Sequence, residues 1–297
     1  MFLPPPPMRR VADLCKAALA VSLLSAASPA AAQFVFYEER EEAEQTPTAP
    51  QMALMGTIPI YWGEAAGIDE MLSGAAEPHW ARQVLERDFT LAPLDYLDAE
   101  ALAGHDYLLL AQPRGLTGEE NVALDAWVRA GGNLLLFADP LITAESRFPL
   151  GDRRRPQDTV LLSPILTRWG LDLQFDGAQD TDLQMREFAG FPLPVQMAGR
   201  LAPLMPGAAC TLEAEGVVAW CRIGSGHALI VADAAVIDLA GPYEGAEAAF
   251  IRLLAHSMGN LGEEPADIDP IRVRSPGHGH YHNSPASEDT DQREPQR

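Results

Sequence analysis

Residues 116–140, with the sequence LTGEENVALDAWVRAGGNLLLFADP, decide the fold of this chain. Thr117 and Glu120 have the spacing of a capping box, and the apolar residues that follow share one helical face, so a helix is expected to begin here. A Gly-Gly pair ends that helix. The next six residues, 133–138, are apolar on both faces, as in a strand buried inside a parallel sheet. The stretch therefore predicts a helix followed directly by a central strand.

Similar short apolar runs lie on either side of this stretch. Residues 107–111 (YLLLA) and 228–232 (ALIVA) each end in a turn signal and are predicted to be buried strands. Residues 56–61 (GTIPIY) are expected to form the first strand, at an edge or a strand end because of Pro59. Further helices are expected at 76–86, 163–169 and 244–258. Strands that alternate with helices predict an α/β fold with a doubly wound, mostly parallel sheet.

Residues 210–223 interrupt this alternation and predict an added β-hairpin. A two-residue turn at Glu215 and Gly216 would place Cys210 directly opposite Cys221, in a hydrogen-bonded pair with Cα atoms about 5.5 Å apart. That distance permits a disulfide, and an oxidising compartment favours one. The alternative is two buried thiols, because cross-strand bridges fit the closer, non-hydrogen-bonded pairs better.

The first 32 residues are typical of an export signal. Arg9, Arg10 and Lys16 precede a short apolar run, and three alanines end the segment before Gln33. The run is too short to span a membrane. We expect cleavage after residue 32 and a periplasmic or otherwise exported product; the alternative is an uncleaved N-terminal anchor.

The remaining chain divides into three parts by composition. Residues 33–51 form an acidic linker, residues 52–262 the α/β domain, and residues 263–297 a disordered tail low in apolar residues. Within the tail, His278, His280 and His282 alternate at a spacing that could trap a divalent metal. A flexible tail has no outer shell of partners to orient these ligands, so no metal is assigned.

The charge balance excludes several classes of function. With 21 Lys and Arg against 42 Asp and Glu, the chain has a formal net charge of −21, which disfavours nucleic acid and anionic lipid as partners. The predicted signal has a net positive charge of two, so its removal takes the value to −23. Lys16 is the one lysine of the chain. A mature protein without lysine excludes lysine-based phosphate binding, Schiff-base chemistry and a lysine general base.

No catalytic motif stands out. The sequence has no Gly-x-Ser-x-Gly and no Cys-x-x-Cys, and each histidine before the tail stands alone. Lone histidines are more often core or surface residues than catalysts. No cofactor is therefore expected.

Open α/β sheets bind ligands beyond the carboxyl ends of their strands, so a site is sought at residues 62–64, 112–114, 139–158 and 233, which we call the strand-end face. Four arginines between 147 and 155 suit recognition of carboxylate or phosphate, or docking on an acidic partner. The alternative is an exposed loop neutralised by Asp152 and Asp158. The ligand- or partner-binding candidates are Trp62, Glu64, Arg114, Asp139, Arg147, Arg153, Arg154, Arg155 and Asp233.

Residues 116–140 and 222–238 (RIGSGHALIVADAAVID) resemble the auxiliary domain of uncharacterised ABC-type transport systems, related to gliding-motility auxiliary proteins. The resemblance implies a class I glutamine amidotransferase-like fold, which is a flavodoxin-like three-layer α/β sandwich. Enzymes of that superfamily carry a nucleophilic cysteine just after the strand that corresponds to 133–138. Here Ala138-Asp139-Pro140 occupies that place, and no His-x-Glu follows the later strand. The resemblance therefore implies the fold without its hydrolytic machinery.

The leading hypothesis is a non-enzymatic, exported auxiliary component of an ABC-type transport system. It would bind a ligand or partner at the strand-end face, with permease or ATPase subunits as partners and no membrane span after signal cleavage. One alternative is a periplasmic metal-dependent hydrolase acting through Asp139 and Asp233, although Asp also ends strands and caps helices routinely. Another is a scaffold in envelope assembly that has no small-molecule site.

Overall fold

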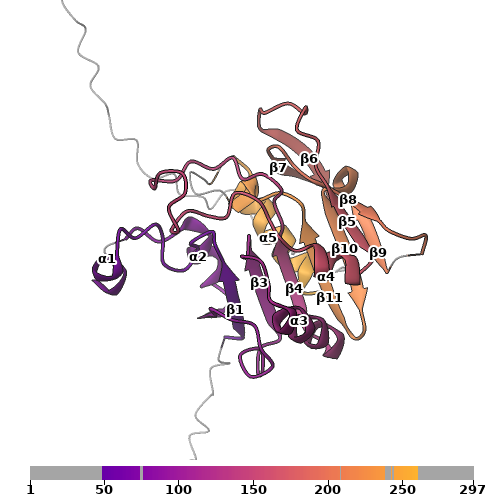
Figure 1. Cartoon of the computed structure of the whole chain (residues 1–297), viewed down its shortest axis with the longest axis horizontal. Helices are drawn as coiled ribbons and strands as arrows, with labels where there is room; N and C mark the ends of the chain where they lie inside the picture. The colour runs from indigo at the N-terminus through magenta and orange to yellow at the C-terminus, as the bar shows by residue number, and fades with distance from the viewer. Residues whose placement is uncertain (1–48, 74–75, 208, 238–241, 243, 260–297) are drawn as a thin grey trace, which may run out of the picture. The chain divides into compact units, whose positions relative to one another are not determined.

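A seven-stranded sheet forms the centre of the protein in its computed structural model, which describes residues 49–73, 76–207, 209–237, 242 and 244–259 (Figure 1). The strand order is β2-β1-β3-β4-β11-β10-β9. The first five of these strands run parallel, and β10 is antiparallel to both β11 and β9. The strands are β1 Gln51–Gly56, β2 Thr90–Pro93, β3 Tyr107–Ala111, β4 Asn133–Phe137, β9 Cys210–Glu213, β10 Val218–Ile223 and β11 Gly226–Val231.

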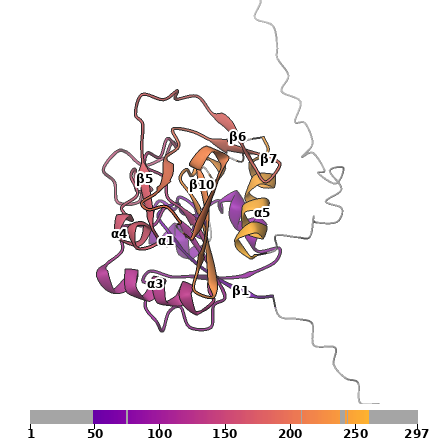
Figure 2. The ribbon, with the colours of Figure 1, turned by 90° about the vertical axis from the view of Figure 1, so that its right-hand side faces the viewer.

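Helices cover both faces of this sheet, so its central strands are buried on both sides. Leu109 and Leu135 belong to one hydrophobic core and their neighbours Leu108 and Leu134 to the other, because successive side chains of a strand point to opposite faces. Figure 2 shows α3 and α4 on one side of the sheet and α5 on the other. The predicted α/β fold with a mostly parallel sheet is confirmed. The helices are α1 Ile68–Ser73, α2 Trp80–Leu85, α3 Gly118–Ala130, α4 Ser163–Arg168 and α5 Ala246–Ser257.

The capping box of α3 is formed as predicted. The Thr117 hydroxyl accepts the Glu120 N–H at 3.2 Å, and the Glu120 carboxylate accepts the Thr117 N–H at 2.8 Å. The helix ends at Gly131, whose φ of 127° a residue with a side chain rarely adopts. Helices α4 and α5 also lie within the predicted ranges.

The first strand lies about five residues earlier than predicted. Four consecutive buried residues (MALM, 52–55) form its centre, and Gln51, assigned to the linker, begins it. At Gly56 the backbone runs so close to β3 that an added Cβ would lie 2.0 Å from the Ala111 carbonyl oxygen. Thr57 then donates its N–H to the Gln112 carbonyl at 3.0 Å and leaves the sheet. Pro59 therefore lies in the loop after β1.

The hairpin has the predicted pairing but a longer turn. Cys210 lies opposite Cys221 and is joined to it by a disulfide, as expected. The turn is a four-residue 3₁₀ turn, in which Val217 donates to the Ala214 carbonyl at 3.1 Å. In an antiparallel hairpin, hydrogen-bonded and non-hydrogen-bonded pairs alternate along the strands. The loop is two residues longer than predicted, which shifts this alternation by one position. The cysteines therefore form a non-hydrogen-bonded pair, with Cα atoms 4.0 Å apart. The prediction of a hydrogen-bonded pair was wrong.

Several elements carry no clear sequence signal. Two small antiparallel sheets flank the main one, and α1 has no buried residue. Among the described residues no helix has the length and apolar character needed to cross a bilayer. Residues 1–48 and 260–297, which hold the predicted signal, most of the linker and the histidine tail, lie outside the described part of the chain. The small sheets are β5 Leu171–Gln174 with β8 Arg200–Pro203, and β6 Gln184–Phe188 with β7 Phe191–Val195.

Candidate functional site

The loops that follow β1, β3, β4 and β11 meet at one edge of the sheet, where the strand-end face was predicted. Gln112, fully buried, joins two of them. Its Nε2 donates to the carbonyls of Asp139 and Gln157, both at 2.9 Å, and its Oε1 accepts the Asp139 N–H at 2.8 Å. The sequence predicts Gln112 as a turn residue on the strand-end face, but the hydrogen bonds by which its side chain joins the two loops were not predicted.

The carboxylates of Asp139 and Asp233 hold loop backbone. Asp139 accepts the N–H groups of Leu141 at 2.8 Å and Ala234 at 3.0 Å, one on each oxygen. Asp233 in the same way accepts those of Gln196 at 2.9 Å and Ala235 at 2.7 Å. Both aspartates are buried. This geometry fits the loop-capping alternative better than a metal pair, and the described residues contain no group of three or more His, Cys, Asp and Glu that could hold a metal ion.

Glu64 locks the loop after β1 to the loop after β4. Its carboxylate accepts the Ser146 hydroxyl and the Arg147 N–H, the latter at 3.1 Å. In return Arg147 Nη1 donates to the Glu64 carbonyl at 2.9 Å and lies 3.9 Å from Glu70. The structure therefore brings together two of the predicted candidates, Glu64 and Arg147, and places the guanidinium of Arg147 near a second carboxylate, Glu70.

The other arginines of this loop are largely paired within it. Arg154 holds Asp152 through two contacts of 3.0 and 2.6 Å, and this hydrogen bonding lowers the pKa of Asp152 to about 2. Arg155 donates to the Phe148 carbonyl at 2.8 Å and lies 3.8 Å from Asp158. Arg153 is exposed and makes no polar contact with the rest of the described chain. The alternative of a loop neutralised by Asp152 and Asp158 accounts for two of the four arginines.

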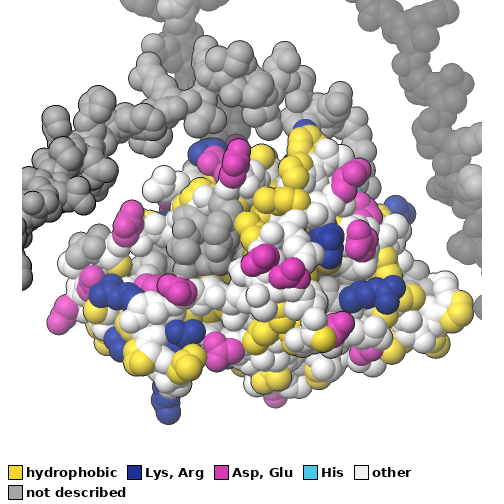
Figure 3. Space-filling model, turned by 90° about the horizontal axis from the view of Figure 1, so that it is seen from above, with side chains coloured by type: hydrophobic (Ala, Val, Ile, Leu, Met, Phe, Trp, Pro, Cys, Tyr) yellow, Lys and Arg dark blue, Asp and Glu magenta, His cyan; other side chains and the backbone are white. Residues whose placement is uncertain are grey.

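The strand-end face therefore has no uniform positive charge. Figure 3, seen from above the view of Figure 1, shows Lys and Arg side chains interspersed with Asp, Glu and hydrophobic side chains. The Arg114 guanidinium is also already paired, because it forms a bidentate ion pair with the buried Glu120 at 2.9 and 2.7 Å. Trp62 is 46% exposed and packs edge-on against Tyr61, with ring centroids 4.7 Å apart. An anion site built from all these arginines has no support in this arrangement.

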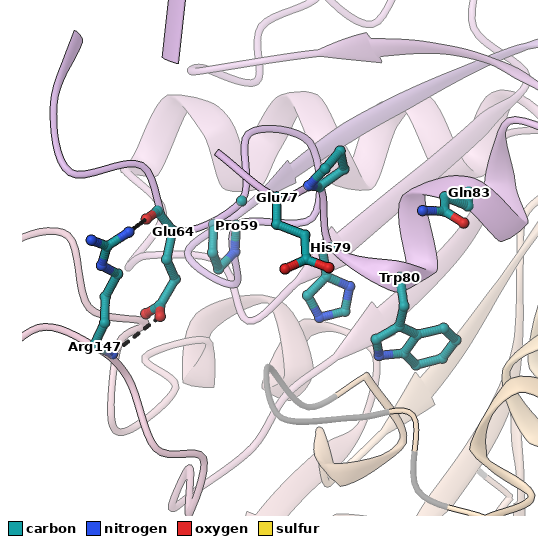
Figure 4. Close-up of a pocket in the computed structure, with 9 residues that line it drawn as sticks. Pro59, Glu64, Glu77, His79, Trp80, Gln83 and Arg147 are labelled. Carbon is teal, nitrogen blue, oxygen red and sulfur yellow. Dashed lines mark hydrogen bonds between the residues drawn. The ribbon is translucent and has the colours of Figure 1, made fainter. Parts of the chain in front are cut away.

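The loop after β1, helix α2 with the segment before it, and Arg147 of the loop after β4 line a cavity of about 420 Å³. In Figure 4, Arg147 and Glu64 lie at one end, Trp80 and Gln83 at the other, and Glu77 and His79 between them. Two of the lining residues, Glu64 and Arg147, are among the candidates that the sequence predicts. The full lining is Pro59, Gly63, Glu64, Glu77, Pro78, His79, Trp80, Gln83 and Arg147.

Two close contacts give the cavity its shape. Gly63, with a φ of +66°, approaches the backbone of Glu77 so closely that an added Cβ would lie 2.2 Å from the Glu77 carbonyl oxygen. Arg82 of α2 donates to the Tyr61 carbonyl at 2.6 Å and lies over the Tyr61 ring. Both contacts hold α2 against the loop after β1. The helix begins at Trp80 because the ring of His79 accepts the Ala81 N–H at 3.1 Å as its N-cap.

Solved structures with a related arrangement are remote. The mmIFT52 N-terminal domain shares 10% identity, with a TM-score of 0.46 over 71% of this chain and 97% of that one. An exo-β-1,4-mannosidase from Opitutaceae bacterium strain TAV5 shares 12% identity, with a TM-score of 0.38. A β-galactosidase from Halorubrum lacusprofundi shares 14%, with a TM-score of 0.39. The last two also match 71% of this chain, which spans 34% and 30% of their respective lengths.

At these TM-scores no fold family is assigned from the solved structures. None of the curated proteins compared with the chain matches it. A family model does match, and it covers the segment that supplies α2, α3, β3, β4 and most of the cavity lining. Residues 69–188, from α1 to the end of β6, match the model of the family described as an ABC-type uncharacterised transport system.

Proposed function

We propose that this chain is an exported auxiliary component of an ABC-type transport system and binds a ligand or partner at its strand-end face. The observation that carries the proposal is the family match over residues 69–188. This segment includes Glu77, His79, Gln83 and Arg147, which line the cavity. The family match therefore covers six of the nine residues that line this cavity.

The proposal assigns binding rather than catalysis to this face. If the domain has the class I glutamine amidotransferase-like fold that its sequence resembles, the nucleophile would follow β4. Ala138, Asp139 and Pro140 stand there, and the Asp139 carboxylate is committed to two backbone N–H groups. A residue held in this way supports the loops and does not present a nucleophile to a substrate.

Export is the second element of the proposal. It depends on the signal-like residues 1–32 and is supported by the Cys210–Cys221 disulfide, since disulfides persist in oxidising compartments such as the periplasm. Mass spectrometry of the protein recovered from the periplasmic fraction tests it. A mature chain beginning at Gln33 is expected, and a chain found only in the cytoplasmic fraction would refute export.

The transport link is tested by site-specific photo-crosslinking of the full chain in cells. A crosslinking amino acid replaces Arg153, which is exposed on the strand-end face, or Val122, which is 70% exposed on α3. We expect the Arg153 position to capture an ABC permease or ATPase subunit and the Val122 position to capture less of it. Recovery of no transporter subunit from either position would overturn the proposal.

A further inference from the structure

The chemistry of the cavity indicates what it binds. We propose that it takes a small organic cation, a ligand that carries an ammonium group, with the Glu77 carboxylate as its counter-charge and the Trp80 indole as its aromatic wall. The inference rests on the proposed function for the expectation that the strand-end face binds a ligand. It concerns the ligand alone and makes no use of a transporter subunit.

The charges that line the cavity favour a cation. Two carboxylates, Glu64 and Glu77, face one guanidinium, Arg147. The Glu64 oxygens already accept the Ser146 hydroxyl and the Arg147 N–H. The Arg147 guanidinium in turn donates to the Glu64 carbonyl at 2.9 Å and lies 3.9 Å from the Glu70 carboxylate, so it already has an acidic partner outside the cavity lining.

Glu77 supplies the second negative charge that lines the cavity. Its carboxylate makes no hydrogen bond or ion pair with another described residue, and Figure 4 shows it in the middle of the cavity. The surrounding protein, with a net charge of −21, adds a field that concentrates cations at such a hollow.

An aromatic side chain, Trp80, lines the same cavity at the end away from Arg147 (Figure 4). The Trp80 ring lines the cavity and packs edge-on against Phe250, with centroids 5.8 Å apart. The ring of His79, which is 7% exposed, also lies near Trp80, with centroids 5.7 Å apart. Trp is the side chain whose face attracts ammonium groups most strongly, and a ring held by two aromatic neighbours loses little entropy when a ligand binds.

The arrangement fits an organic cation better than a metal ion. Divalent cations such as Ca²⁺ require six to eight oxygen ligands, and Mg²⁺ requires an octahedral set. Here one carboxylate is open to the cavity, and the part of the chain that the structure describes holds no cluster of three or more metal-ligating side chains. One carboxylate together with an indole is instead the combination that recognises an ammonium group.

The volume of the cavity limits the size of the ligand. At about 420 Å³ it has room for a small metabolite and little more. The close approach of Gly63 to Glu77 fixes the backbone of Glu77 against the loop after β1, on one wall of the cavity.

Isothermal titration calorimetry of the purified full chain tests the proposal, with choline and putrescine as organic cations and MgCl₂, CaCl₂ and sodium glutamate as comparison ligands. Saturable binding of choline or putrescine is expected. Glu77→Gln should weaken it about tenfold and Trp80→Leu by a similar factor. Glu100→Gln, an exposed change outside the cavity, is the matched control and should leave the affinity unchanged. Circular dichroism confirms that each variant is folded.

Two results would overturn the inference. The first is the absence of saturable binding for both organic cations. The second is equal affinity of the Glu77→Gln and Glu100→Gln variants for the organic cations. That result would show only a general attraction of cations to an acidic protein, and such binding would disappear in a titration at raised salt. Crosslinking to a transporter subunit from Arg153 is independent of both results, so failure of this inference and failure of the proposed function are distinguishable.

Discussion

Arg114 and Glu120 form a bidentate ion pair across the start of α3, with Nη1–Oε2 and Nη2–Oε1 distances of 2.9 and 2.7 Å. The Glu120 side chain is fully buried and that of Arg114 is 40% exposed. The same carboxylate accepts the N–H groups of Thr117 and Leu97. One buried carboxylate therefore fixes the start of α3, the turn after β3 and the loop before it.

This pair makes the stability of the protein depend on pH. Burial alone would raise the pKa of Glu120, but the Arg114 guanidinium and the backbone N–H donors together lower it to about 2. Because the folded pKa lies below the ordinary value of 4.5, the stabilisation is fully present above about pH 5 and is lost as the pH falls towards 2. We expect Glu120→Gln to lower the free energy of unfolding at pH 7 by about 2 kcal/mol.

Urea unfolding at pH 7 and pH 3 measures the effect. The difference between wild type and Glu120→Gln should be smaller at pH 3. Glu119→Gln, its exposed neighbour in the first turn of α3, is the control and should change little at either pH. A difference for Glu120→Gln that is the same at both pH values would contradict the assignment of the ionised pair.

The disulfide provides a second test of stability. Cys210 and Cys221 close a short loop, and Cys221 is fully buried in the core formed with α3 and α4. A bridge over a loop of this length contributes about 3 kcal/mol, mainly by restricting the unfolded chain. We expect the double variant Cys210→Ala/Cys221→Ala to lose about that amount in urea unfolding, and dithiothreitol to destabilise only the wild type. Two thiols titrated in the denatured, unreduced wild type would refute the bridge.

Local signals explain which parts of the fold the sequence predicted. Two of these signals are the capping box at Thr117 and Glu120 and the apolar run of β4. Each depends only on residues close to it in the sequence, and the structure confirms both. The opposition of Cys210 and Cys221 followed from the position of the turn, but the pair type required the turn length, which Glu215 and Gly216 do not specify. The sequence therefore predicted which residues of the two hairpin strands face each other, but not whether the cysteine pair is hydrogen-bonded.

The cavity could not be predicted because tertiary contacts build it. Residues 76–86 have the pattern of one helix, whereas α2 begins only at Trp80, so Glu77 and His79 belong to the loop. The approach of Gly63 to Glu77 joins segments that no periodicity links. The four arginines were visible as a charge cluster, with Asp152 and Asp158 as neighbours that could neutralise it, but the contacts of Arg147 with the Glu64 carbonyl and with Glu70 were not.

Substitution of Gly63 separates backbone strain from steric clash. Gly63 and Gly104 both have positive φ, +66° and +82°, so alanine strains either position by about 1 kcal/mol. At Gly104 the added Cβ meets nothing within 4 Å, whereas at Gly63 it meets the Glu77 carbonyl oxygen at 2.2 Å. We expect Gly63→Ala to lower the melting temperature clearly more than Gly104→Ala. Equal effects would show that the loop after β1 does not press on Glu77.

Substitution of Asp139 tests the metal-dependent hydrolase alternative. An amide has one acceptor oxygen, so Asp139→Asn leaves either the Leu141 or the Ala234 N–H without its partner, at a cost of about 1–3 kcal/mol. Urea unfolding measures this loss, and Asp88→Asn, at an exposed position, should change it little. We expect Mg²⁺, Ca²⁺ and Zn²⁺ to leave the melting temperature of the wild type unchanged. A metal-induced increase that Asp139→Asn abolishes would instead favour the hydrolase.

Limited proteolysis tests the contact between the loops after β1 and β4. Trypsin cleaves after arginine, and the loop after β4 carries Arg147 and residues 153–155. Glu64→Ala removes the acceptor of the Ser146 hydroxyl and the Arg147 N–H, so this loop should open more often and be cut several-fold faster. Mass spectrometry of the fragments over time follows the cleavage. Glu100→Ala should be cut at the wild-type rate; a Glu64→Ala chain cut no faster than this control would show that Glu64 does not hold the two loops together.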